Sequence, residues 1–511
     1  MRWRSSTQYR ESTSGEPRPH PESARPSRLS RWTEGILEGG ALGVLVLAPW
    51  LFGAVEPWAQ AAVFSATALL LAVWIVRASA TGRPLHLPSG WIPAVCFLAW
   101  VSFQVMPIPS GLVALLCPER FRLEQQAAHL LGISAPRWFA LSVDPQMTRR
   151  YAWEFAGIGL YAVLLWNIVS DGRRLRRLLL AILAAGAALT LFGIIQRATW
   201  NGYLYWVRPI HGGDPFGPYV NRSHMGGLLL LIVLLGLGYL SAQSLRWEND
   251  QRFDWRTWVR LPPDELFERL LLPLLLLIMA AGVLTSKSRG AMVSLLLALF
   301  LMALWFASQG REERRGLLGI AGFFVAGLLA ALWIAADLFL GATERLGGEA
   351  LALDQSPRLA LWPEALELWR RFAWTGTGLG TFDFAFGLVR TVFPGNHAVT
   401  HAESDYMQLL CDTGVVGLGL AFWLILALLM AGSRSLARTE GRRRKRLVLG
   451  GLVAVISACL QGIANFDLSI MANWLYVVAA IVVMGKGGDL GASAGGRWAR
   501  GGETSQESEF A

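Results

Sequence analysis

The chain has 511 residues, of which 54% are hydrophobic and only 16% are charged. Soluble domains carry about 25% charged residues. This composition, with a mean hydropathy of +0.42, therefore excludes a mainly soluble protein and indicates a polytopic membrane protein. The formal net charge of +10 is compatible with nucleic acid or anionic lipid as a partner, and the positions of the basic residues decide between them.

The two ends of the chain differ in composition from the rest. Residues 1–33 are rich in Arg, Ser and Pro and are predicted to form a disordered tail. The first apolar run comes only after this tail, so a cleavable signal peptide is not expected. Residues 486–511 are rich in Gly and predict a second disordered tail. The segment between the tails, 34–485, is predicted to be an all-α transmembrane domain.

Apolar runs long enough to cross about 30 Å of hydrocarbon recur along this segment. About twelve transmembrane helices are predicted, at residues 35–55, 59–76, 91–106, 151–169, 178–196, 223–243, 270–285, 290–307, 317–340, 407–431, 447–464 and 469–485.

Twelve spans place both termini on the same side of the membrane. Most of the 46 Lys and Arg residues fall in the tails and in loops on that side, including SDGRRLRR, SQGREERRG and GSRSLARTEGRRRKR. The positive-inside rule therefore places both termini in the cytoplasm. In this interpretation the basic clusters determine topology, and a nucleic-acid partner is not supported.

This topology leaves four external segments of interest, at 107–150, 197–222, 286–290 and 341–406. Loops longer than about 15 residues are usually functional or disordered, which makes the longest segment the main candidate for a site. It contains PRLALWPEALELWRRFAW, in which apolar residues recur near helical spacing. This pattern predicts an amphipathic helix at the membrane interface.

Three motifs in these segments converge on one family. They are PFGPYVNRSHMGGLLLL at 215–231, LTSKSRGAMVSLLLAL at 284–299, and RLALWPEALELWRRFAWTGTGLGTFDF at 358–384 followed by HAESDYMQLLCDTGVVG at 401–417. Their order and shared external side resemble the O-antigen ligase and O-antigen polymerase superfamily, over roughly residues 180–435.

The resemblance implies a bacterial inner-membrane glycosyltransferase whose site faces the periplasm. Its donor would be an undecaprenyl-pyrophosphate-linked glycan. Its acceptor would be lipid A–core in a ligase, another carrier-linked glycan in a polymerase, or a protein hydroxyl in an oligosaccharyltransferase. The family implies no metal and no cofactor. Membrane lipids would surround the domain.

Candidate pyrophosphate-binding residues are Arg222, Arg289 and Arg358, which match arginines of the family. The leaving group is anionic, and a planar guanidinium can bind phosphate oxygens in bidentate fashion. The alternative for the first two is an interfacial arginine that reaches lipid head groups, and for Arg358 a structural cap. The glycines of GTGLGTF, at 376–380, are expected to allow a tight turn.

The acceptor hydroxyl needs a general base. Ligases of this family place a His before Asn, Ser or Gln, then nine residues, Gly, two residues and Gly. Counting back from Gly414 and Gly417 places Glu403 at the His position, with His401 two residues earlier. Glu403 is the slightly favoured base, with His401 orienting it or sharing the proton. The alternative is that both side chains only solvate the start of the following helix.

Asp405 and Asp412 are expected to favour a helix N-terminus, and His224 and His397 are expected to be interfacial. A metal on His397 and His401 is disfavoured because Pro and Gly lie just upstream. The alternative function is a polytopic transporter or flippase for a cell-envelope lipid or glycan, and a scaffold role is less favoured still. The two halves of the chain look unlike, which argues against the repeats of many transporters.

Overall fold

The computed structural model describes residues 28–210, 213–245, 263–310, 322, 357–391 and 399–488. Three predicted features lie largely outside these residues. They are most of the two tails, the span at 317–340 apart from residue 322, and the first part of the long loop. The tail prediction is wrong for its last six residues, because helix α1 begins at Arg28.

Each of the remaining eleven predicted spans coincides with a helix. In chain order these helices are α1 (Arg28–Leu47), α2 (Pro57–Thr81), α3 (Trp91–Val105), α6 (Pro145–Ile168), α7 (Gly172–Ala198), α8 (Arg222–Ser244), α11 (Leu272–Thr285), α12 (Arg289–Ser308), α16 (Asp405–Arg438), α17 (Arg442–Ala464) and α18 (Met471–Lys486). A π-helical turn at Phe267–Leu271 and the short α10 (Pro263–Leu266) lead into α11.

Within the described residues, seven helices are long and apolar enough to cross a membrane, and α3 and α18 are apolar but shorter. An all-α membrane protein is therefore confirmed, while the total of twelve spans stays a prediction.

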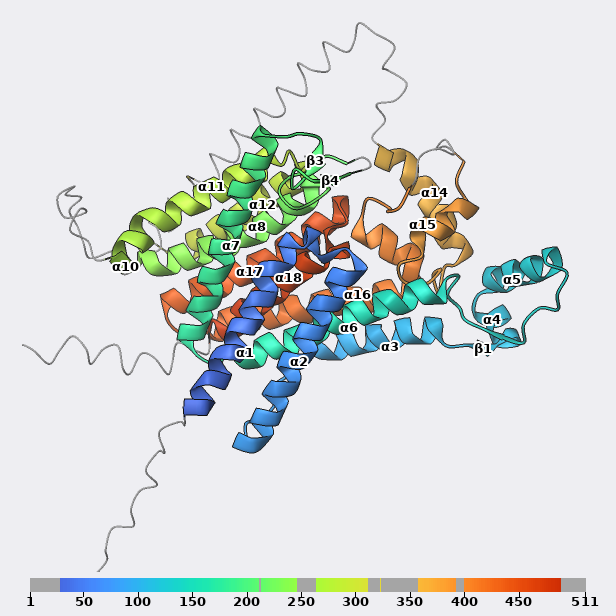
Figure 1. The fold of residues 1–511 in the computed structure, drawn as a ribbon, viewed down its shortest axis with the longest axis horizontal. Helices are drawn as coiled ribbons and strands as arrows, with labels where there is room; N and C mark the ends of the chain where they lie inside the picture. The colour runs from blue at the N-terminus through green and yellow to red at the C-terminus, as the bar shows by residue number, and fades with distance from the viewer. Residues whose placement is uncertain are drawn as a thin grey trace, which may run out of the picture.

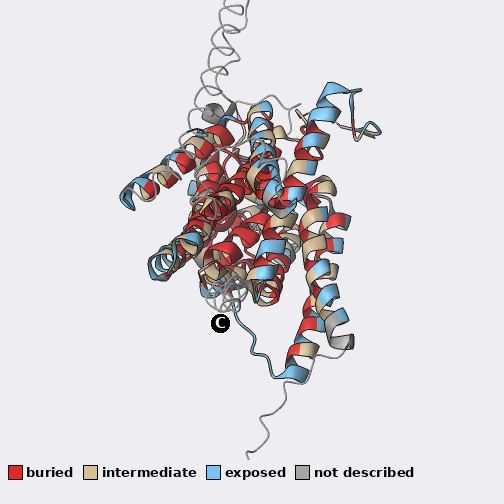
Figure 2. Ribbon diagram, turned by 90° about the vertical axis from the view of Figure 1, so that its left-hand side faces the viewer, coloured by how far each residue is buried: buried red, intermediate tan, exposed pale blue. Residues whose placement is uncertain are grey.

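Helix α8 forms the centre of the bundle. In its most apolar 18-residue window, 94% of the residues are buried, against 17% for α16. Figure 2 shows the same contrast, with buried residues in the middle and exposed ones on the outer helices. Glycines allow the central contact, because a Cβ on Gly238 of α8 would lie 2.7 Å from the Cα of Gly450 on α17. The peripheral α16 instead exposes large apolar side chains, as a lipid-facing helix does.

A smaller second layer caps one end of the bundle. It contains α4 (Ser110–Leu116), α5 (Pro118–Leu130), α14 (Pro357–Arg371), α15 (Phe382–Ala385) and the paired strands β1 (Ile108–Pro109) and β2 (Trp138–Phe139). These elements share an apolar core of their own with Cys411 of α16. Figure 1 shows them together beyond the ends of α3, α6 and α16.

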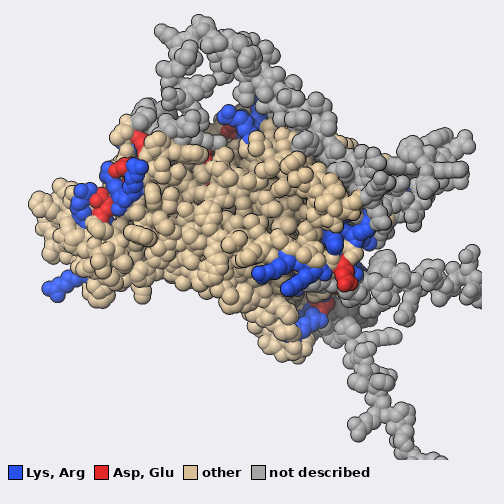
Figure 3. Space-filling view, turned by 180° about the vertical axis from the view of Figure 1, so that it is seen from behind, with Lys and Arg blue, Asp and Glu red and all other residues tan. Residues whose placement is uncertain are grey.

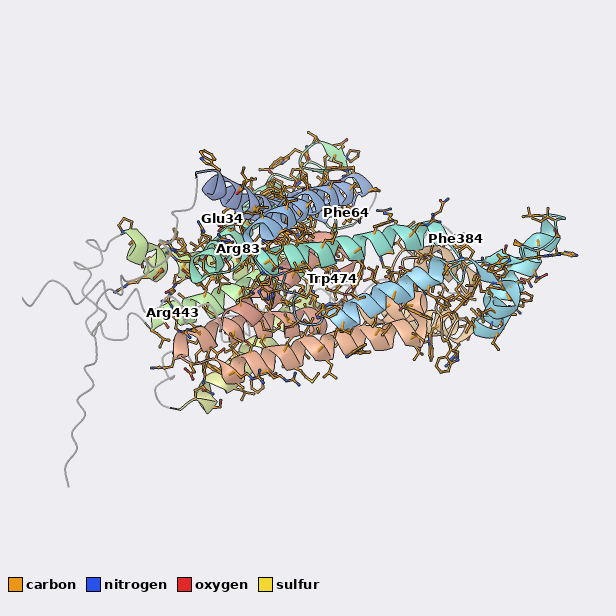
Figure 4. All side chains as sticks on the ribbon, turned by 90° about the horizontal axis from the view of Figure 1, so that it is seen from below. Glu34, Phe64, Arg83, Phe384, Arg443 and Trp474 are labelled. Carbon is orange, nitrogen blue, oxygen red and sulfur yellow. The ribbon has the colours of Figure 1, made fainter. Side chains whose placement is uncertain are left out.

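Charged groups mark the two ends of the bundle. Figure 4 shows Phe384 at the end with the second layer, and Glu34, Arg83 and Arg443 at the opposite end. At that opposite end Arg77, Arg83 and Arg174 all pair with Glu34. In Figure 3 the surface between the two ends is almost free of charged side chains.

Gly414 divides α16 into two segments. Its φ is +66°, and a Cβ there would lie 2.3 Å from the carbonyl oxygen of Trp374. The break frees backbone groups that bond the neighbouring GTGLGT turn, since Thr377 N donates to Cys411 O at 3.0 Å and Gly378 N to Asp412 O at 2.8 Å. All three glycines of that turn have positive φ, so the predicted tight turn is confirmed. The segment 405–413 therefore runs in a different direction from the long segment 415–438.

Gly414→Ala is expected to destabilise the protein by at least about 1–2 kcal/mol, the cost of a left-handed conformation for alanine, because the new methyl group would also overlap the Trp374 carbonyl. The measurement is the melting temperature of the detergent-solubilised protein. Gly419→Ala is the matched control, since a Cβ there has nothing within 4 Å. Equal melting temperatures for the two variants would contradict this account of the kink.

Candidate functional site

The candidate site lies where α7 ends and where α8, α12 and α16 begin. Arg222 is the first residue of α8, and Asn221 caps that helix by accepting from Ser223 N at 2.9 Å. Arg289 is the first residue of α12, after the cap Ser288, which accepts from Ala291 N at 3.3 Å. Two helix N-termini therefore point their partial positive charges to the same region as the two arginines.

The structure brings a third arginine to this pair. Arg197, in the last turn of α7, and Arg289 both lie close enough to Arg222 to repel its charge. Asp214 holds two of the three, because its carboxylate pairs with Arg222 and lies 3.6 Å from Arg197 Nη1. We call Arg197, Arg222 and Arg289 the arginine cluster. The side chains of Arg197 and Arg222 are partly exposed and Arg289 is exposed, as the binding of an external anion requires.

The turn before α12 is held against α8 by a small residue. A Cβ on Gly226 would lie 2.7 Å from Ser286 Oγ, so the SKSRG turn packs directly on the first turns of α8. Lys287 in this turn adopts a φ of +52°. The predicted convergence of Arg222 and Arg289 therefore has a structural basis in backbone packing.

Arg358 is the second residue of α14. Its backbone belongs to α14, and its side chain lies outside the described part of the structure. Its neighbour in the motif, Trp362, donates from Nε1 to Ala402 O at 3.1 Å. Helix α14 is thereby fixed to the segment that carries His401 and Glu403.

His401 is held in a defined tautomer. Gln408 Oε1 lies 3.1 Å from His401 Nδ1 and accepts from Ala402 N at 3.4 Å. Because the backbone N–H identifies that atom as the amide oxygen, Nδ1 must donate to it and the lone pair of the neutral ring is on Nε2. The ring stacks on Phe466 with centroids 4.1 Å apart. Burial lowers the pKa of His401 below its ordinary value, with the Gln408 hydrogen bond opposing the shift.

Glu403 occupies a strained turn just before α16. Its φ is +56° and its side chain is half-buried. The next residue, Ser404, caps α16 by accepting from Met407 N at 3.4 Å, and its hydroxyl donates to Gly462 O at 3.3 Å. The cap fixes the position of Glu403 two residues from the imidazole, so both candidate bases share one short loop.

A buried His–Asp pair, which no sequence motif predicted, adjoins these residues. His224 Nδ1 lies 2.7 Å from Asp467 Oδ1, which also accepts from Asn465 Nδ2 at 2.6 Å. His224 contacts Phe466 edge-on at 4.6 Å, so one phenyl ring touches both imidazoles. The prediction of an interfacial His224 is wrong, because the residue is only 5% exposed. The carboxylate keeps the His224 lone pair on Nε2.

Asp405 and Asp412 also have roles that the helix pattern did not predict. Asp405 Oδ2 accepts from Leu468 N at 3.2 Å, and Asp412 Oδ2 accepts from Gly380 N at 2.9 Å. Both acids therefore bind backbone groups of other segments rather than only facing the first turns of α16. Within the described residues, no three His, Cys, Asp or Glu side chains are grouped as metal ligands, and His397 lies outside them.

Comparison with known families agrees with the motifs. Residues 274–422 match the family model described as O-antigen ligase. This confirms the resemblance to the O-antigen ligase and polymerase superfamily and indicates a membrane enzyme of the glycosyltransferase type. No curated protein matches the chain. The matched segment contains Arg289, Arg358, His401 and Glu403, whereas Arg222 precedes it.

Asp467→Asn is expected to lower turnover by about tenfold or more, because an amide no longer fixes the tautomer of the adjacent imidazole. The measurement is the turnover of folded protein, with a melting curve recorded for the same sample. A lower melting temperature with unchanged turnover per folded molecule would show that the pair is only structural.

Proposed function

We propose that the protein transfers or polymerises a glycan from an undecaprenyl-pyrophosphate donor on the outer face of the bacterial cytoplasmic membrane. The observation that carries this proposal is the arginine cluster beside a neutral imidazole with a defined lone pair. Arg222 and His224 share the first turn of α8, and Phe466 connects His224 to His401 by ring contacts on both sides. Cations for a leaving anion and a base for an alcohol therefore occur in one site.

In the proposed reaction the acceptor hydroxyl oxygen attacks the anomeric carbon of the donor sugar. The bond from that carbon to the pyrophosphate oxygen breaks, and its electron pair stays on the pyrophosphate. The hydroxyl proton passes to Nε2 of His401, whereas the motif alone slightly favoured Glu403. Glu403 is the second candidate to accept it. The guanidinium groups stabilise the negative charge that develops on the leaving group.

Asp214 fits this mechanism as an internal anion. It pairs with Arg222 and Arg197, and these contacts hold the two side chains in position. A pyrophosphate carries more charge and more acceptor oxygens than one carboxylate, so it can displace this contact. The arginines are then already ordered before the donor binds.

Both termini are proposed to be cytoplasmic. Support comes from the basic loops at the end of the bundle opposite the candidate site, including the segment of α17 that begins RRRKR. The positive-inside rule assigns that end to the cytoplasm. The site then faces outward, where lipid-linked glycans and no nucleotide sugars would be available.

The pH dependence of transfer follows from the burial of His401. Because its pKa lies below the ordinary value of about 6.5, the ring stays neutral and able to accept a proton as the pH falls through 6.5. Transfer is expected to stay level from pH 8 to about 6.5 and to fall only at lower pH. The measurement is kcat against pH in proteoliposomes. An acidic limb centred above pH 6.5 would contradict His401 as the base.

A reconstituted reaction tests the function and separates its forms. Purified protein is mixed with an undecaprenyl-pyrophosphate oligosaccharide from its host, and products are analysed by gel and mass spectrometry. A ladder of longer carrier-linked glycans without added acceptor identifies a polymerase. Transfer only after addition of lipid A–core or a protein acceptor identifies a ligase or an oligosaccharyltransferase. No turnover with any of these acceptors would overturn the proposal in favour of a transporter.

A further inference from the structure

A short hairpin with a strained turn lies at the outer end of α7. Its strands are β3 (Tyr203–Leu204) and β4 (Arg208–Pro209), and Figure 1 shows it beside the end of this helix. Two residues of the turn, Tyr205 and Trp206, have φ values of +55° and +62°. Bulky L-residues rarely adopt this left-handed region, because Cβ then approaches the backbone too closely. The turn therefore costs free energy that packing around it must offset.

Strain of this kind is concentrated near the candidate site. Six non-glycine residues have positive φ in the part of the chain that the structure describes. Two of them are Lys287, in the turn before α12, and Glu403. The other four lie in two loops that meet through a ring contact at 5.4 Å, namely Phe52, Ala54, Tyr205 and Trp206. Strained residues persist mainly at binding and catalytic sites, so these two loops are candidates for a binding site.

Aromatic rings from three segments meet at the hairpin. The ring centroid of Phe192 on α7 lies 5.2 Å from that of Trp50, 5.0 Å from that of Tyr205 and 5.7 Å from that of Trp206. Trp50 belongs to the turn that follows α1. We call these four residues the aromatic cluster. Trp206 remains 37% exposed, so part of the cluster is open to a ligand.

The polar ends of the two turn residues point into the protein. Trp206 Nε1 donates to Thr199 Oγ1 at 3.0 Å, and the Tyr205 hydroxyl donates to Trp50 O at 2.6 Å. Tryptophan and tyrosine of a membrane-interface belt instead direct their polar ends to water or head groups. What the aromatic cluster exposes is ring surface. Such a surface suits a hydrocarbon better than a glycan, whose hydroxyl groups need polar partners.

The aromatic cluster borders the arginine cluster. Thr199, which accepts from the indole N–H, is two residues beyond Arg197. Gln196 joins the hairpin to the segment before α8. In the amide orientation that satisfies both neighbours, its oxygen accepts from Tyr205 N at 2.6 Å and its nitrogen donates to Gly217 O at 2.7 Å. A ligand held by the arginines therefore has the exposed rings next to it.

The candidate base lies on the other side of α8. Helix α7 packs on α8, α8 packs on α17, and α17 packs on α16, which begins just after His401. A donor whose anomeric carbon faces His401 has its pyrophosphate at the arginine cluster. Beyond the pyrophosphate it continues toward α7 and the hairpin. The group bonded to that far end of the pyrophosphate is the carrier lipid.

The outer face of α7 connects this position with the membrane. Leu191 and Ile195 are 56% and 45% exposed, and Ala198, one turn further, is exposed as well. The opposite face packs on the bundle, where a Cβ on Gly193 would lie 3.2 Å from the ring of Phe216. Half of the most apolar window of α7 is buried. A hydrocarbon chain in the bilayer can therefore follow α7 as far as the aromatic cluster.

From these observations we infer that the aromatic cluster binds the isoprene units nearest to the pyrophosphate of a polyprenyl carrier, and that the rest of the chain lies along the outer face of α7. The inference rests on the proposed donor. The strained turn and its inward hydrogen bonds hold the rings in place before binding, which lowers the entropy cost of ordering them. The arginine cluster fixes the head of the carrier and the aromatic cluster fixes the start of its chain.

Photo-crosslinking of the wild-type protein locates the chain and depends on no variant. The probe is glycan-free undecaprenyl pyrophosphate with a diazirine in its first isoprene unit, added to the purified full-length protein in nanodiscs. It is expected to label residues 189–198 and 203–209. Unlabelled undecaprenyl pyrophosphate is expected to compete at least about tenfold better than phosphatidylglycerol, which has one phosphate rather than two. Labelling confined to other segments, or equal competition by the phospholipid, would overturn the inference.

Trp206→Gly removes one ring while glycine tolerates the positive φ. The variant is expected to weaken binding of glycan-free undecaprenyl pyrophosphate by about fivefold or more, because apolar contact is lost, and to bind inorganic pyrophosphate as the wild type does. Trp58→Ala is the matched control, since Trp58 is 55% exposed at the start of α2 and outside the aromatic cluster. It is expected to bind both ligands normally. Unchanged carrier affinity in folded Trp206→Gly, or an equal loss for both ligands, would overturn the inference.

These binding measurements involve no transfer, so they separate the inference from the proposed function. Carrier binding at the aromatic cluster without glycan transfer to any acceptor would support the inference and refute the proposed reaction. A glycan-bearing donor provides the complementary test. If Trp206→Gly weakens binding of that donor and leaves the glycan-free carrier unaffected, the rings bind the glycan and the assignment to the carrier chain is wrong.

Discussion

Arg222→Ala and Arg289→Ala are each expected to lower glycan transfer by about 10²- to 10³-fold, the usual cost of removing one group that stabilises a developing anion. Both residues begin a helix, and their guanidinium groups lie near Arg197 around Asp214. Each substitution removes a full positive charge from the proposed position of the leaving pyrophosphate. The measurement is turnover of the purified variants under saturating donor.

The control for these variants is another arginine on the same side of the protein. Arg208 pairs with Glu56 at 2.5 Å and stacks over Phe52 at 4.2 Å, outside the arginine cluster. Arg208→Ala is expected to keep most of the activity. Conservative Arg→Lys variants of Arg222 and Arg289 should recover only part of it, because Lys lacks the bidentate geometry. Wild-type turnover in Arg289→Ala would remove that residue from the site.

His401→Gln is expected to reduce transfer by about 10²- to 10⁴-fold, the range for loss of a general base. The amide keeps much of the shape and can still bond Gln408, but it cannot accept the proton. The measurement compares kcat for His401→Gln and Glu403→Gln, with release of carrier pyrophosphate followed in both. Because Glu403 lies at a φ of +56°, a melting curve for each variant separates misfolding from loss of catalysis.

The pair of variants also decides between the two candidate bases. If His401 accepts the proton, Glu403→Gln keeps a measurable fraction of activity and His401→Gln keeps almost none. The reverse order would assign the base to Glu403, as its position in the ligase pattern indicates. Full activity in both would contradict a base in this loop.

Local sequence features predicted the helices well. Hydropathy is a property of consecutive residues, so each apolar run in the described part of the chain coincides with a helix within several residues. The N-terminal boundary failed because α1 extends back through a polar segment to Arg28, where composition suggested a tail. The kink at Gly414 could not be predicted, since it depends on the docking of the segment that contains Trp374.

The candidate site was predicted only in part. Family motifs pointed to Arg222, Arg289, His401 and Glu403, which the structure places at neighbouring helix ends. The His224–Asp467 pair joins residues 243 positions apart, and neither belongs to a local pattern with the other. Arg197 had one available signal, its place in the last turn of a helix before an external segment. Contacts between distant segments depend on packing, and one sequence does not encode them in any readable spacing.

The most direct test of the central claim is the release of undecaprenyl pyrophosphate from its glycan by the purified protein. The donor carries a label in the carrier lipid, acceptor is present, and free carrier pyrophosphate and transferred glycan are counted in one reaction. The account predicts one released carrier for each glycan transferred, with both signals lost together in Arg222→Ala and His401→Gln. Glycan transfer without carrier release, or release that persists unchanged in both variants, would contradict it.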